Sequence, residues 1–121
     1  MRFFKFFLFC CAFFTTATYA EDQSTELRCS YRVMQRLYPE LNPLPRPDKY
    51  KHCVGSCYMT YECNFTESMS MGVIKEVWDV FTPGDADWAD LRADFRGSYL
   101  GMLKKRLPLI SCEDRCGEWY P

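Results

Sequence analysis

His52 is the single histidine of the chain, and its neighbours along a predicted helix are residue types with which an imidazole can do chemistry. Asp48, His52 and Ser56 follow one another at intervals of four residues, so they form one line on a helix. In an acid–base–nucleophile arrangement, the aspartate would orient the imidazole and the serine would give up its proton. Known triads take their members from different elements, because the nucleophile must also face an oxyanion hole. We therefore prefer a structural interpretation: Asp48 caps the helix, His52 bonds to Asp48, and Ser56 lies at a helix contact.

A second group with possible chemistry is acidic. Its members are Glu76, Asp79, Asp85, Asp87, Asp90 and Asp94. The last three lie three and four residues apart, so they share a helix face that could hold a hard cation together with Glu76 and Asp79. No Asp-x-Asp-x-Asp-Gly loop is present to specify calcium. We prefer a solvated acidic face with Asp85 as a helix N-cap, and we expect no metal and no cofactor.

The cysteines predict a disulfide framework. Six of them lie beyond residue 20: Cys29, Cys53, Cys57, Cys63, Cys112 and Cys116. An even number in a small exported domain indicates disulfides, whereas zinc needs reduced thiolates and finds only one histidine here. Two pairs are spaced four apart, so antiparallel helices would join Cys53 to Cys116 and Cys57 to Cys112, which leaves Cys29 for Cys63. Six cysteines allow fifteen connectivities, so this pairing is one candidate among them.

The first twenty residues have the three parts of a cleavable signal peptide. Arg2 and Lys5 form a positive n-region, residues 6–14 form an apolar region too short to span a bilayer, and residues 18–20 (Thr-Tyr-Ala) form a cleavage site. We expect cleavage after Ala20 and a secreted or periplasmic location. No later stretch is apolar for long enough to form a transmembrane helix.

Cleavage leaves one domain, residues 21–121. A lipoprotein modified at Cys10 or Cys11 is an alternative, but a small residue is needed before that cysteine, and Phe9 or Cys10 stands there. The signal peptide carries two of the 15 basic residues and none of the 16 acidic ones, so the mature domain has an acidic excess of three. This balance argues against nucleic acid as a partner.

The hydrophobic pattern predicts an all-α, disulfide-stapled bundle of about four helices. We expect helices from about residue 25 to 38, from 48 to 63, from 66 to 81 and from Asp85 to Pro108, followed by a short turn with the last two cysteines. The proline-rich residues 39–47 predict an extended connector, and the four-residue spacing of Gly97 and Gly101 predicts close helix packing. An apolar stripe, Met69, Val73, Val77 and Val80 or Phe81, is expected to face inward. A shared core of the last two helices is expected from Trp78, Trp88, Leu91 and Phe95.

Residues 48–57 (Asp-Lys-Tyr-Lys-His-Cys-Val-Gly-Ser-Cys) resemble a motif of small helical domains in bacterial secreted proteins, often at the C-terminal ends of Rhs-type polymorphic toxins. In that family a Lys-Glu pair with a later Asp follows, and then Asp-x-x-Ala-Asn-x-x-Gly. The matching residues here are Lys75, Glu76 and Asp79, and then Asp90, Ala93 and Gly97, with Asp94 in place of the usual asparagine. The resemblance covers residues 48–97 and implies an exported helical domain rather than a particular reaction. It nominates Lys51, His52, Ser56, Glu76 and Asp90 as site positions.

Two functions from different classes are compatible with these features. In the first, the domain is an exported binding or effector-like, toxin-associated module that displays a surface to a protein partner or an envelope component. In the second, it is a small hydrolase with His52 as general base, and Glu76 or Asp90 orients the imidazole or holds a metal. We favour the first function, because no nucleophile motif accompanies the histidine. The structure can discriminate between the two functions. A hydrolase requires the side chains of His52, Glu76 and Asp90 to converge in one pocket, whereas a binding module allows them to scatter over the surface.

Overall fold

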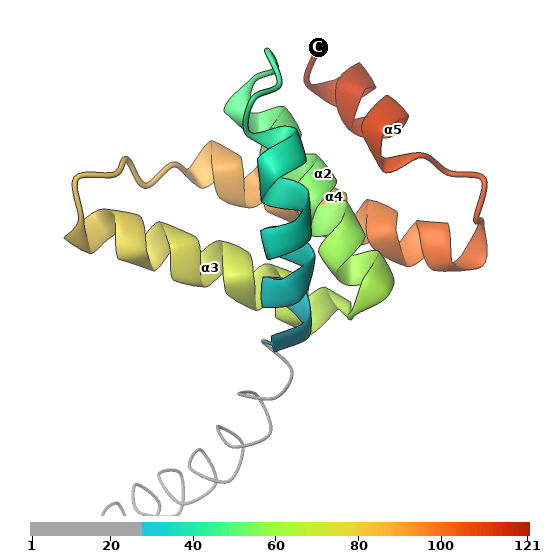
Figure 1. Ribbon diagram of the computed structural model, residues 1–121, viewed down its shortest axis with the longest axis horizontal. Helices are drawn as coiled ribbons and strands as arrows, with labels where there is room; N and C mark the ends of the chain where they lie inside the picture. The colour runs from blue at the N-terminus through green and yellow to red at the C-terminus, as the bar shows by residue number, and fades with distance from the viewer. Residues whose placement is uncertain (1–27) are drawn as a thin grey trace, which may run out of the picture.

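The computed structural model describes residues 28–121, which form an all-α bundle without strands, as the hydrophobic pattern predicts (Figure 1). A first helix at residues 28–41 is followed by α2 (Asp48–Glu62), α3 (Phe65–Phe81), α4 (Trp88–Arg106) and α5 (Cys112–Trp119). The expected signal peptide lies outside the described residues. None of the described helices is long and apolar enough to cross a membrane.

Two helix ends differ from the predicted ones because of local capping. α4 begins at Trp88 and not after Asp85, because Asp87 is the N-cap and accepts a hydrogen bond from the Ala89 N–H at 2.8 Å. The predicted final turn is the eight-residue helix α5, whose N-cap Ser111 accepts from a backbone N–H in the first turn. The bundle therefore has one helix more than the sequence predicts.

The proline-rich connector is shorter than predicted. The first helix continues through Pro39 to residue 41, although the proline removes one main-chain hydrogen bond from the last turn, and Leu41 is buried in the core. Asp48 does not cap α2. The N-cap is Pro47, which makes no side-chain hydrogen bond, and Asp48 is the first helical residue.

Glycines bring α2 and α4 into backbone contact, as their spacing predicts. A Cβ atom on Gly97 would lie 2.8 Å from the carbonyl carbon of Cys53, and one on Gly101 would lie 2.7 Å from the Cβ of Thr60. These separations are shorter than real side chains allow, so only glycine permits the approach. Residue numbers increase together along this contact, and the two helices therefore run in the same direction where they touch.

Three disulfides link the helices: Cys29–Cys63, Cys53–Cys116 and Cys57–Cys112. This is the pairing expected for antiparallel packing of α5 on α2. One bridge fastens the first helix to the end of α2, and the other two fasten α5. Disulfides form in oxidising compartments, so this framework is consistent with an extracellular or periplasmic location.

The predicted core between α3 and α4 is wrong. Trp78 is 67% exposed and Trp88 is 83% exposed, and Phe95 is exposed as well. Only the first half of α3 is buried, and its second half extends to one side of the molecule together with the loop 82–87 and the start of α4 (Figure 1). A helical period predicts an apolar stripe, but the start of α4 faces this one only across an open cleft, so most of its side chains stay exposed.

Candidate functional site

His52 is a residue of α2, and its side chain faces α4, close to three aspartates. Its Nδ1 is 2.9 Å from Oδ1 of Asp94, while its Nε2 is 3.7 Å from Oδ2 of Asp48 and 3.8 Å from Oδ2 of Asp90. Asp90 is 5% exposed and Asp94 is 3% exposed, whereas Asp48 lies at the surface. The predicted solvated acidic face is therefore wrong for Asp90 and Asp94. The close packing of α4 on α2 turns both carboxylates toward the histidine.

Asp94 is the centre of the polar contacts. Its Oδ1 accepts hydrogen bonds from the Nδ1–H of His52 and from the Oγ of Ser56, both at 2.9 Å. Gly72 of α3 covers Oδ2 so closely that an added Cβ would lie 2.5 Å from it. A carboxylate enclosed by three helices in this way holds the imidazole in one orientation.

Two of the nominated residues lie outside the surroundings of the imidazole. Lys51 points toward the connector, where its Nζ donates to the backbone carbonyl of Asn42 at 2.8 Å. Ser56 is fully buried, and its hydroxyl donates to Asp94 and not to His52. The line of residues 48, 52 and 56 is therefore no catalytic triad, because a substrate cannot reach the serine.

Glu76 belongs to the same polar network but not to the immediate surroundings of His52. Its Oε2 accepts from the Asp87 backbone N–H at 2.8 Å. The side chain of Asp87 bonds in turn to Lys49 Nζ at 3.1 Å, and Nζ is 3.6 Å from Oδ1 of Asp90. Lys49, which no sequence argument singled out, is thus the lysine at this site. His52 and Asp90 converge directly, and Glu76 joins them through two intermediates.

The sequence analysis named Asp48, Glu76 and Asp90 as carboxylate partners for His52 and missed Asp94. The expected hydrogen bond from His52 to Asp48 is wrong, because the two side chains are 3.7 Å apart and the imidazole bonds to Asp94. One sequence signal was available: Asp94 stands where the resembled family has asparagine, four residues after Asp90. Choosing between the two aspartates required the register of α4 against α2, which is set by the backbone contact at Gly97.

The electrostatic surroundings favour a charged imidazole. Burial opposes protonation of His52, but the hydrogen bond to Asp94 and the charge of Asp94 outweigh it, so the pKa of His52 is raised above its ordinary value of 6.5. Burial raises the pKa of the Asp90 carboxyl. Because a carboxylate only accepts hydrogen bonds, Nδ1 carries a hydrogen, and Nε2 is the atom that can take a proton or bind a cation.

We expect NMR titration of the disulfide-bonded protein, with chelator present, to give a His52 pKa above 6.5, and Asp94→Asn to lower it. A raised pKa in the folded state stabilises the fold below the unfolded value of about 6.5, and this contribution is lost as the pH rises through the folded pKa. The difference in unfolding free energy between the parent and Asp94→Asn should therefore be larger at about pH 5.5 than at about pH 9. A His52 pKa below 6.5 in the parent protein would contradict this prediction.

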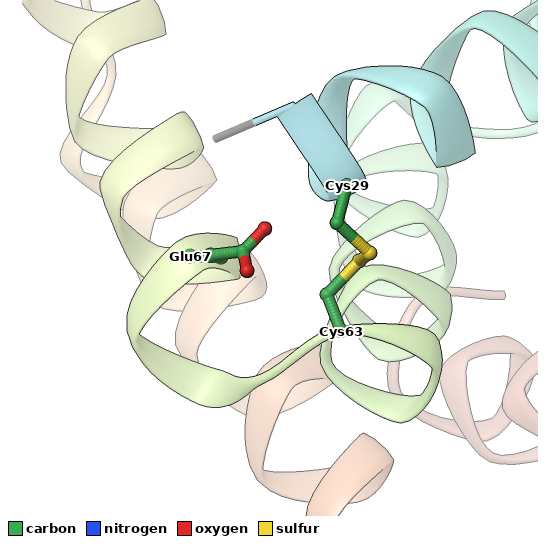
Figure 2. Close-up of side chains that lie close together, drawn as sticks. All are labelled: Cys29, Cys63 and Glu67. Carbon is green, nitrogen blue, oxygen red and sulfur yellow. A yellow bond between two sulfur atoms is a disulfide. The ribbon is translucent and has the colours of Figure 1, made fainter. Parts of the chain in front are cut away.

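Glu67 is a third buried carboxylate, and the sequence analysis did not identify it. Its Oε2 accepts hydrogen bonds from the backbone N–H and the hydroxyl of Ser30, each at 3.1 Å. Figure 2 shows the carboxylate beside the Cys29–Cys63 disulfide, facing the helix at residues 28–41. The two sulfurs are bonded to each other and offer no thiolate, so this group ties helices together and is not a metal site.

No protein-family model, curated protein or solved structure matches this chain. The chemistry of the site is therefore argued from its geometry alone. Asp94 orients an imidazole whose free nitrogen, Nε2, faces the carboxylates of Asp48 and Asp90. This arrangement can hold a proton or a cation at Nε2.

Proposed function

We propose that the protein is an exported binding module that docks on a partner protein through an apolar arm, residues 73–91. The observation that carries this proposal is a set of exposed apolar side chains on the arm: Val73, Ile74, Val77, Trp78, Val80, Phe81 and Trp88. Soluble monomers rarely expose contiguous apolar patches larger than a few hundred Å², and larger patches mark interaction sites. Tryptophan and phenylalanine are also enriched at protein interfaces.

The arm is hollowed where α3 faces the start of α4. A cleft of about 440 Å³ lies there, lined by Val73, Glu76, Val77, Val80, Ala86, Asp87, Trp88 and Leu91. Most of these side chains are apolar, so the cleft suits an apolar ridge of a partner, such as one face of an amphipathic helix. The disulfide-linked helices would serve as the rigid base from which the arm projects.

The charges around the cleft indicate what kind of partner fits. Glu76 and Asp87 line it, and Asp79 and Asp85 lie on the same arm. The one lysine of the arm, Lys75, is paired with Asp79 at 3.0 Å. An acidic rim around an apolar cleft complements a partner with basic flanks and repels an anionic lipid surface. The resemblance to toxin-associated domains supports an effector-like setting for this binding.

We expect a photoreactive amino acid at position 80 to crosslink a specific partner from the protein's native environment, and one at position 109 to crosslink none. Leu109 is a matched control, because it is fully exposed but lies outside the arm. With the partner purified, Trp88→Ala should weaken its Kd by about 30-fold, which corresponds to a hot-spot loss of about 2 kcal/mol. The same variant should change the unfolding free energy by less than about 1 kcal/mol, since the ring is exposed.

Three results would contradict the proposal. Crosslinking at position 80 could be no stronger than at position 109. Sedimentation could show a dimer that Trp88→Ala dissociates, which would make the arm a self-association surface. Binding to vesicles could be lost in Trp88→Ala, which would make the arm a membrane anchor.

A small hydrolase remains the second candidate, because Asp94 orients His52 as an acid–base residue requires. Its nucleophile cannot be Ser56, which is buried. A raised His52 pKa also moves the range in which the imidazole can act as a base toward higher pH. The NMR titration measures the pH range in which the basic form exists.

A further inference from the structure

Three potential metal-ligand atoms, two from α2 and one from α4, lie close together where these helices face each other. The Nε2 of His52 and one carboxylate oxygen each from Asp48 and Asp90 all lie within 4.8 Å of one another. Nε2 is 3.7 Å from the Asp48 oxygen and 3.8 Å from the Asp90 oxygen. Bonds of about 2.0–2.2 Å to a tetrahedral zinc place neighbouring ligands about 3.4 Å apart. The two separations from Nε2 would have to shorten by a few tenths of an ångström to complete such a site. The two carboxylate oxygens lie within 4.8 Å of each other, and the exposed side chain of Asp48 is free to move closer.

The orientation of His52 suits metal binding. Its Nδ1–H donates to Asp94, which leaves the lone pair of Nε2 directed toward two carboxylates. A cation placed between Nε2 and the two carboxylates would bind all three groups, and it would compete for Nε2 with the proton that the same carboxylates favour. Histidines that ligate metals commonly donate their other ring N–H to a carboxylate, which fixes the ring and makes it a better ligand.

Asp90 gives an independent indication of a missing ligand. The residue is 95% buried, and its Oδ1 has no hydrogen-bond partner among the described residues. A buried carboxylate without a partner is costly, so each such group calls for an explanation. The nearest cation is Lys49, at 3.6 Å, beyond hydrogen-bonding distance and engaged with Asp87. The oxygen that faces the site is Oδ2, which lies 3.8 Å from Nε2 of His52, while Oδ1 is turned toward Lys49. A metal ion at Oδ2 would give this buried carboxylate a directly bound cation.

We propose that Asp48, His52 and Asp90 bind a divalent transition-metal ion, with Zn²⁺ the best match, and that Asp94 is a positioning residue for His52. One imidazole with two carboxylates suits Zn²⁺, whereas Ca²⁺ and Mg²⁺ prefer six or more oxygen ligands. Three protein ligands leave a fourth position for water or a substrate oxygen. This site differs from the sequence-based expectation of no metal, and it is independent of the apolar arm.

The test is calorimetric titration of Zn²⁺ into the disulfide-bonded protein after chelator treatment and without reductant, so that no free thiolate competes. We expect one Zn²⁺ per chain, with Ca²⁺ and Mg²⁺ at least about 100-fold weaker. On NMR, Zn²⁺ should shift the His52 ring resonances while the Nδ1–H bond to Asp94 persists. No stoichiometric Zn²⁺ binding in the parent protein would overturn the proposal.

Matched variants assign the ligands. Asp48→Asn changes a surface residue and should weaken Zn²⁺ at least about tenfold, while Asp114→Asn, an exposed acid on α5, should leave it unchanged. Asp94→Asn, which touches no metal, should weaken it about 10- to 100-fold. Lys49→Met should strengthen binding several-fold, because it removes the cation that competes for Asp90. Equal affinity in the parent, Asp48→Asn and Lys49→Met would overturn the proposal. Trp88→Ala should bind Zn²⁺ normally, so this test is separate from that of the arm.

Discussion

Loss of both disulfides between α2 and α5 is expected to lower the free energy of unfolding by about 6–7 kcal/mol, although loss of either one alone should cost only about 2.5 kcal/mol. The Cys53–Cys116 and Cys57–Cys112 bridges span 63 and 55 residues of the chain, but they lie only four residues apart on each helix. Either bridge alone closes a long loop of the chain. When one bridge is already present, the other closes only the short loop between the two bridges. The chain-entropy relation assigns about 4 kcal/mol to a loop of about 60 residues and about 2.5 kcal/mol to one of about eight.

Urea unfolding of three variants measures this difference: Cys53→Ala with Cys116→Ala, Cys57→Ala with Cys112→Ala, and all four together. Intact-mass spectrometry should show that the remaining cysteines are paired in each variant. A loss of 6–7 kcal/mol is comparable to the whole stability of a small domain, so the fourfold variant should be largely unfolded in water. If the fourfold variant unfolds cooperatively with a loss below about 3 kcal/mol, the packing of α5 and not the bridges holds it in place.

Gly97→Ala is expected to lower the free energy of unfolding by roughly 3 kcal/mol, although alanine in a helix is normally about 1 kcal/mol better than glycine. The added Cβ would lie 2.8 Å from the carbonyl carbon of Cys53 and closer still to its oxygen. These are main-chain atoms of α2, which cannot rotate away as a side chain can. α4 must therefore move outward, and Asp94, three residues away, moves with it.

The control is Gly117→Ala in α5. An added Cβ there would lie 3.8 Å from a ring carbon of Tyr50, which is an ordinary contact, so this variant should gain about 0.5–1 kcal/mol. The two variants make the same chemical change in two helices, and urea unfolding should give opposite signs. A neutral Gly97→Ala would show that α2 and α4 separate at little cost, and that the register at His52 does not depend on this glycine.

The helices and the disulfide framework could be predicted from the sequence because their signals are local. Apolar residues at helical spacing define each helix, and the paired four-residue spacings of the cysteines require two thiols on one helix face. With those two faces antiparallel, only one pairing of the four cysteines remains. The close approach at Gly97 and Gly101 was predictable for the same reason, since a glycine every fourth residue leaves one face without side chains.

The partner of His52 and the exposure of the arm were decided by the tertiary structure. Asp90 and Asp94 lie on the same face of α4, and only the register of that helix against α2 brings Asp94 to Nδ1 and leaves Asp90 near Nε2. The apolar stripe of α3 and the ring of Trp88 have the pattern of a core, but a pattern specifies a face and not what covers it. Burial depends on whether another element reaches that face, and among the described residues no other helix lies over the arm.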